Sequence, residues 1–89
     1  MGKIRLLLVD DEQFLCKIVK LNLERSGDYE VTTAYSGEEG LRKAQEARFD
    51  IILTDLRMPS MNGENLVQAL KAVHPDVPVL VWTVCYGNP

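Results

Sequence analysis

Three aspartates, placed at the ends of two apolar runs, are the part of this chain best suited to chemistry. Asp10 and Asp11 follow the apolar run 4–9, and Asp55 follows the run 49–54. Ligands of open parallel α/β sheets bind at the carboxyl ends of the strands, so two strands that finish in Asp would bring these carboxylates together. Neighbouring carboxylates resist ionising together, and a divalent cation relieves that repulsion. Mg2+ accepts one or two carboxylates with waters and phosphate oxygens, so the pattern predicts a metal-assisted phosphate site.

Apolar patterns of two kinds alternate along the chain and define the elements that must position these carboxylates. Short runs rich in Val, Ile and Leu indicate strands, and longer segments with apolar residues every three or four positions indicate helices. Ser36 followed by Glu39 is a capping box that starts one helix, and Gly27 ends another. The β-α-β-α-β-α-β order favours a doubly wound parallel sheet of the α/β class. We expect strands at residues 4–9, 29–34, 49–54 and 77–82, and helices at residues 14–25, 36–47 and 62–74.

Size and composition are those of one small globular domain. The 89 residues are 46% hydrophobic and 26% charged, with a formal net charge of −3. Lys and Arg are scattered, which argues against direct nucleic-acid binding by this segment. No apolar run approaches the roughly 18 residues of a membrane span. Cys16 and Cys85 share no metal-ligand spacing, so we expect free thiols and a cytoplasmic protein.

Three segments, residues 8–12, 55–63 and 78–83, resemble the receiver domain of two-component response regulators. The second segment, Asp-Leu-Arg-Met-Pro-Ser-Met-Asn-Gly, contains the string Asp-x-x-Met-Pro-x-Met-x-Gly, which is highly specific for that family. The acidic pair in the first segment would be weak alone, but the match runs through the chain in the family's order and spacing. The resemblance implies one receiver domain over residues 1–89, with a flavodoxin-like doubly wound parallel sheet in strand order 2-1-3-4.

The resemblance also implies a role for each site residue. Asp55 would accept a phosphoryl group from the phosphohistidine of a sensor histidine kinase or phosphotransfer protein. Asp10, Asp11, Asp55 and the backbone carbonyl of Arg57 would hold Mg2+. Thr83 would contact a phosphoryl oxygen and act as the switch residue. Such a domain is a phosphoacceptor with self-phosphorylation and dephosphorylation chemistry only, rather than an enzyme that turns over a separate substrate.

The family pattern continues with a further helix, a strand that ends in Lys, and a final helix, so we expect residues 1–89 to lack that helix-strand-helix. A second function of a different class therefore stays open, namely a phosphorylation-impaired receiver that serves as an interaction module. The chain would then form a homodimer or oligomer through its C-terminal region, where the apolar strand 77–82 would be an exposed edge. A third reading is a piece of a longer regulator. A phosphatase is disfavoured because Arg57 occupies the place of its general-acid Asp.

Overall fold

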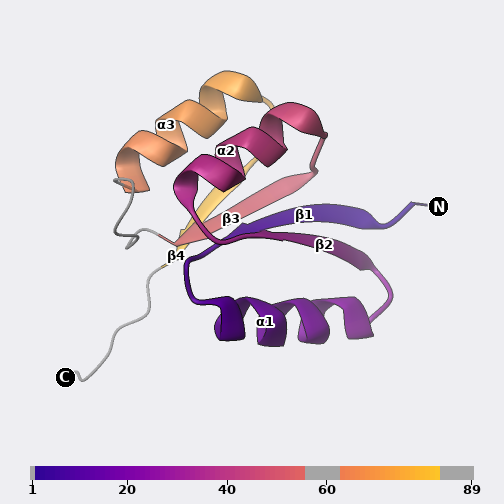
Figure 1. Ribbon diagram of the computed structural model, residues 1–89. Coiled ribbons are helices and arrows are strands. Elements are labelled where there is room, and N and C mark those ends of the chain that lie inside the picture. The colour runs from indigo at the N-terminus through magenta and orange to yellow at the C-terminus, as the bar shows by residue number, and fades with distance from the viewer. Residues whose placement is uncertain (1, 56–62, 83–89) are drawn as a thin grey trace.

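The computed structural model describes residues 2–55 and 63–82, and within them four strands alternate with three helices (Figure 1). The strands form one parallel sheet in the order β2-β1-β3-β4, which confirms the predicted α/β class and the 2-1-3-4 order. The elements are β1 (Ile4–Val9), α1 (Gln13–Arg25), β2 (Tyr29–Ala34), α2 (Gly37–Glu46), β3 (Ile51–Asp55), α3 (Gly63–Val73) and β4 (Val79–Trp82).

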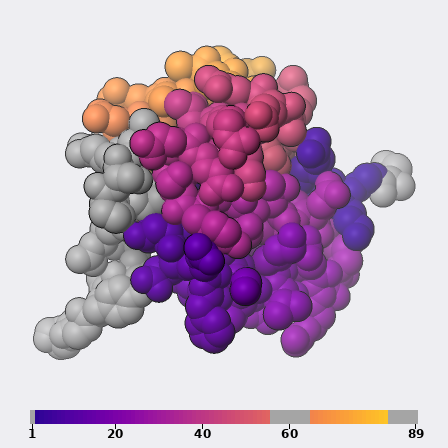
Figure 2. Space-filling view, viewed as in Figure 1, coloured from indigo at the N-terminus to yellow at the C-terminus, as the bar shows by residue number. Residues whose placement is uncertain are grey.

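The sheet lies between two helical layers. Helix α1 covers one face, and α2 and α3 cover the other (Figure 1). Figure 2 shows the same arrangement in space-filling form, with the magenta α2 region above the indigo and purple α1 region. No helix among the described residues is long and apolar enough to cross a membrane.

Strand β1 is the centre of the core because its side chains alternate between the two faces. Leu7 and Val9 pack on the α2 and α3 side, and Leu6 and Leu8 pack on the α1 side. All four are buried, which explains the nearly continuous apolar run of this strand. Because β1 is packed on both faces, the positions of Asp10 and Asp11, which follow it, are fixed.

The predicted strand boundaries were wrong by one or two residues at the third and fourth strands. Strand β4 begins at Val79 instead of residue 77, because Pro78 has no backbone N–H for the sheet and contributes only its carbonyl, which accepts from the Ile52 N–H at 2.9 Å. Strand β3 begins at Ile51 and includes Asp55 as its last residue. Asp55 is therefore held by the sheet rather than by the loop that follows.

Gly40 in α2 is required by its close contact with β1. A Cβ at this position would lie 2.7 Å from Cγ2 and 3.0 Å from Cγ1 of Val9. Val9 is fully buried and β-branched, so it cannot rotate away cheaply. We expect Gly40→Ala to lower the free energy of unfolding by about 1–2 kcal/mol, although Ala has the higher helix propensity.

Urea denaturation measures this effect, with Gln45→Ala at an exposed position of the same helix as the matched control. The control should change stability by less than about 0.5 kcal/mol. A Gly40→Ala protein as stable as the wild type would show that α2 can move away from Val9 without loss.

Candidate functional site

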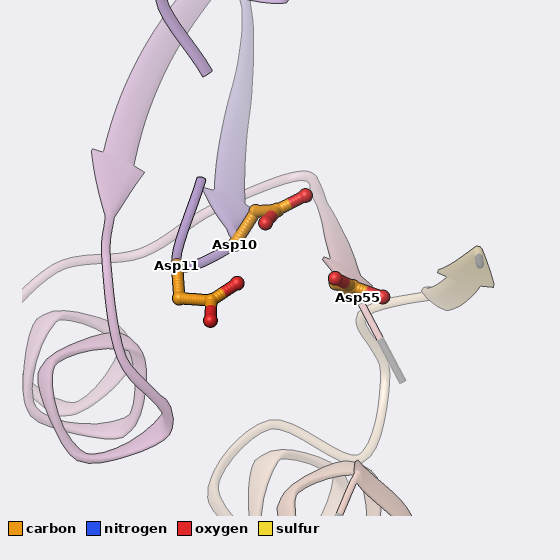
Figure 3. A group of neighbouring side chains, drawn as sticks. All are labelled: Asp10, Asp11 and Asp55. Atoms are coloured by element: carbon orange, nitrogen blue, oxygen red, sulfur yellow. The ribbon is translucent and has the colours of Figure 1, made fainter. Parts of the chain in front are cut away.

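The three predicted aspartates lie together at the carboxyl ends of the two central strands. In the parallel pairing of β1 with β3, Val9 is opposite Thr54. Asp10 and Asp55, the residues that follow, therefore lie side by side at the carboxyl end of the sheet. Asp10, Asp11 and Asp55 each present a carboxylate oxygen within 4.8 Å of the others. Figure 3 shows Asp10 and Asp11 at the end of β1 and Asp55 at the end of β3, around a common space.

Two further predicted site residues, Arg57 and Thr83, lie outside the described residues. The structure therefore brings together the three aspartates of the predicted site. It describes neither the backbone carbonyl of Arg57 nor the hydroxyl of Thr83. The roles assigned to both stay predictions from the family resemblance.

Asp10 is the most constrained of the three carboxylates. It is completely buried; its Oδ1 accepts a hydrogen bond from the Glu12 backbone N–H at 2.9 Å, and its Oδ2 has no hydrogen-bond partner among the described residues. Burial raises the pKa of Asp10 from 3.8 to about 6, the Glu12 N–H opposes that rise, and the charges of Asp55 and Asp11 add to it. An ionised, half-satisfied carboxylate is thus held in a place where a cation would stabilise it.

The backbone of Asp10 is fixed from two sides. Its N–H donates to the Ala34 carbonyl of β2 at 2.9 Å. Its carbonyl accepts from the buried thiol of Cys16, at 3.4 Å from Sγ. Burial raises the pKa of the Cys16 thiol to about 11, so the sulfur keeps the proton that it donates.

Cys16 was predicted only as a free thiol, and its place beside the site was missed. The sequence carried one usable signal, because Cys16, Val19 and Leu23 follow helical spacing and all three pack in the core cluster under α1.

The donor set fits a hard divalent cation. Mg2+ holds oxygen ligands at about 2.0–2.1 Å in octahedral geometry, so oxygens on opposite sides of the ion lie about 4 Å apart. The spread of 4.8 Å or less among the three aspartates is close to that distance and leaves room for water between an aspartate and the ion. Asp10 and Asp11 have no ion-pair partner among the described residues, so no side chain there competes for their charge.

Comparison with known proteins places this geometry in a family. Residues 6–88 match the model of the response regulator receiver domain. The transcriptional regulatory protein ZraR of Salmonella typhimurium is 40% identical over 82 residues, which are 92% of this chain and 18% of that protein. GlrR of Escherichia coli is 44% identical over 78 residues, with 88% of this chain and 17% of that protein covered. The chain thus spans less than a fifth of the length of these two regulators.

Solved structures agree in fold. The chemotaxis protein CheY4 of Vibrio cholerae superposes with a TM-score of 0.83 at 39% identity, over 90% of this chain and 68% of that one. The response regulator TrrA of Thermotoga maritima, in complex with Mg2+-BeF, has a TM-score of 0.85 at 30% identity, over 93% of this chain and 71% of that one. Together with the family match over residues 6–88, these likenesses show that the chain belongs to the receiver domain family of two-component response regulators.

Proposed function

We propose that Asp55 is the phosphoacceptor of this receiver domain and that Asp10 and Asp11 hold the Mg2+ that its phosphorylation requires. Receiver domains are phosphoacceptor switches that take phosphoryl groups from histidine kinases. The assignment rests on one observation: the three carboxylates lie together at the carboxyl ends of the strands, and Asp55 is the last residue of the central strand β3. The TrrA structure, which holds Mg2+-BeF, supports the choice of metal.

Each residue has a separate task in this proposal. A carboxylate oxygen of Asp55 forms the new O–P bond while the N–P bond of a phosphohistidine donor breaks and its electron pair returns to the imidazole. The bound cation would neutralise charge on the phosphoryl oxygens and on the carboxylates. Asp10 keeps its carboxylate directed at the site because its backbone is bonded to Ala34 and Cys16. The Arg57 carbonyl is proposed as a further metal ligand.

The switch role is proposed for Thr83, whose hydroxyl would donate to a phosphoryl oxygen and so report phosphorylation. The donor is proposed to be a sensor histidine kinase or a phosphotransfer protein. The chain matches only a small part of longer transcriptional regulators, so the output of the whole protein is a separate matter.

Incubation with Mg2+ and a small phosphodonor such as acetyl phosphate, followed by intact-mass measurement, tests the proposal directly. We expect the wild type to gain one phosphoryl group, and Asp55→Asn to gain none because it lacks the nucleophilic oxygen. Chelation of Mg2+ by EDTA should suppress the gain in the wild type. Equal labelling of Asp55→Asn and the wild type would place the acceptor elsewhere, and no labelling of the wild type despite Mg2+ binding would favour an interaction module.

One observation favours that second function. Strand β4 lies at an edge of the described sheet, and its Leu80 and Val81 are 52% and 44% exposed. These two residues point to opposite faces, so apolar surface is available on both sides of the strand. We propose self-association through β4 as the alternative role, which sedimentation velocity over a concentration series tests; monomer at every concentration contradicts it.

A further inference from the structure

Strand β2 is the other edge of the sheet that the described residues form, and its outward backbone groups need partners. In a parallel strand, alternate residues direct their N–H and C=O groups to opposite sides. The Ala34 and Asp28 carbonyls accept bonds from β1, at the Asp10 and Ile4 N–H groups. The odd-numbered residues of β2 therefore direct their backbone groups away from β1, where a further strand could bind.

Helix α1 supplies one pair of side chains to this outer edge. Lys20 Nζ donates to the Val31 carbonyl at 3.0 Å, and Glu24 Oε2 accepts from the Val31 N–H at 3.0 Å. The two side chains lie one helical turn apart, with 4.0 Å between Nζ and Oε2. Both outward backbone groups of Val31 are thus occupied by charged partners.

Helix α2 supplies an equivalent pair from the other face of the sheet. Lys43 Nζ donates to the Thr33 carbonyl at 2.6 Å, and Glu39 Oε1 accepts from the Tyr35 N–H at 2.7 Å. These two side chains are also one turn apart, with 3.2 Å between Nζ of Lys43 and Oε2 of Glu39. The Tyr35 N–H, followed by Lys43, holds the pKa of Glu39 below its ordinary value, so the Glu39 carboxylate stays ionised at neutral pH.

We infer that these two Lys–Glu pairs close the β2 edge to strand pairing, so that a second copy of this chain cannot add a strand beside β2. A new strand would have to displace four charge-assisted hydrogen bonds, which are about twice as strong as neutral ones. In the described sheet β4 is the other outer strand, so an open β2 edge would allow a head-to-tail contact between β2 of one copy and β4 of the next, and such a contact repeats without closing.

The inference is independent of phosphoryl transfer and is tested by Lys20→Met/Lys43→Met. Met keeps the length of each side chain but leaves the Val31 and Thr33 carbonyls without their donors. Lys17→Met/Lys71→Met, at two exposed positions, is the matched control with the same change of charge. Sedimentation velocity over a concentration series should show assemblies larger than those of the wild type for the first variant only. Removal of two lysines makes the negative net charge larger, which opposes association. The change of charge alone therefore cannot produce larger assemblies.

A folded Lys20→Met/Lys43→Met variant that sediments like the wild type would overturn the inference; circular dichroism and the urea midpoint establish the folded state. Amide hydrogen exchange of the wild type gives a second test that needs no variant. The Val31 and Tyr35 N–H groups should exchange more slowly than the same amides in the denatured protein, because they donate hydrogen bonds to Glu24 and Glu39. Exchange of both at the unprotected rate would also overturn the inference.

Discussion

Asp10→Asn is expected to weaken Mg2+ binding by more than about 100-fold, because loss of outer-shell partners alone commonly weakens metal sites by 10–100-fold and this change removes a charge from the site itself. Phosphoryl incorporation from acetyl phosphate should fall with it at fixed Mg2+. The same substitution should make the metal-free protein more stable by about 1–2 kcal/mol at pH 7–8, since it removes a buried carboxylate whose pKa is raised to about 6. The two effects have opposite signs, which a general folding defect cannot produce.

Asp50→Asn is the matched control for this experiment. Asp50 lies just before the opposite end of β3, is exposed, and accepts a hydrogen bond from the Arg5 N–H at 2.8 Å, which an Asn oxygen can also accept. Its substitution should leave Mg2+ binding unchanged. Urea denaturation with EDTA gives the stabilities, and a Mg2+ titration of the denaturation midpoint gives the affinities. An Asp10→Asn protein that keeps the wild-type response to Mg2+ would remove Asp10 from the metal site.

The acidic centre could be predicted because its parts are coupled to the simplest patterns in the chain. The apolar runs define the strands, and all strands of a parallel sheet have their carboxyl ends on the same side. Asp10 and Asp55 lie at those ends. The order of the strands came from family resemblance instead, since alternation of elements does not determine which strand lies beside which. The family match confirms the resemblance, and the β2-β1-β3-β4 sheet confirms the strand order.

Local patterns do not reveal which stripe of a helix meets the sheet. Helix α1 has two apolar stripes, and Phe14, Ile18 and Leu21 remain 75%, 40% and 67% exposed. The stripe that includes Cys16 is the buried one, as the position of α1 over β1 and β2 determines. Periodicity shows that a face is apolar, but only tertiary packing selects between two such faces.

The Lys–Glu pairs at β2 were also beyond sequence reasoning. Glutamate and lysine four residues apart are typical of a solvated helix face, and nothing local shows that Lys20 and Lys43 reach backbone carbonyls of another element. Both lysines place their ammonium groups on the outer side of β2, at the Val31 and Thr33 carbonyls.

Stabilisation of the protein by Mg2+ is expected to increase with pH, with most of the change below about pH 6. In the metal-free protein the pKa of Asp10 is raised from 3.8 to about 6. Between these values the folded state keeps a proton that the unfolded chain has lost, so metal-free stability falls as pH rises from about 4 to 6, by at most about 3 kcal/mol. Mg2+ needs the ionised carboxylate, so its binding releases a proton below pH 6 and its apparent affinity rises by up to about tenfold per pH unit there.

The measurement is the urea midpoint with and without Mg2+ at several pH values from about 5 to 8, where the ordinary carboxylates are already ionised. The Mg2+-induced shift should grow up to about pH 6–7 and then level, while the metal-free midpoint moves the other way. Asp10→Asn should remove this part of the pH dependence, because an amide does not titrate. A Mg2+-induced shift equal at pH 5 and pH 8 in the wild type would mean that Asp10 is already ionised without metal, and that the burial of its carboxylate is offset by groups other than a cation.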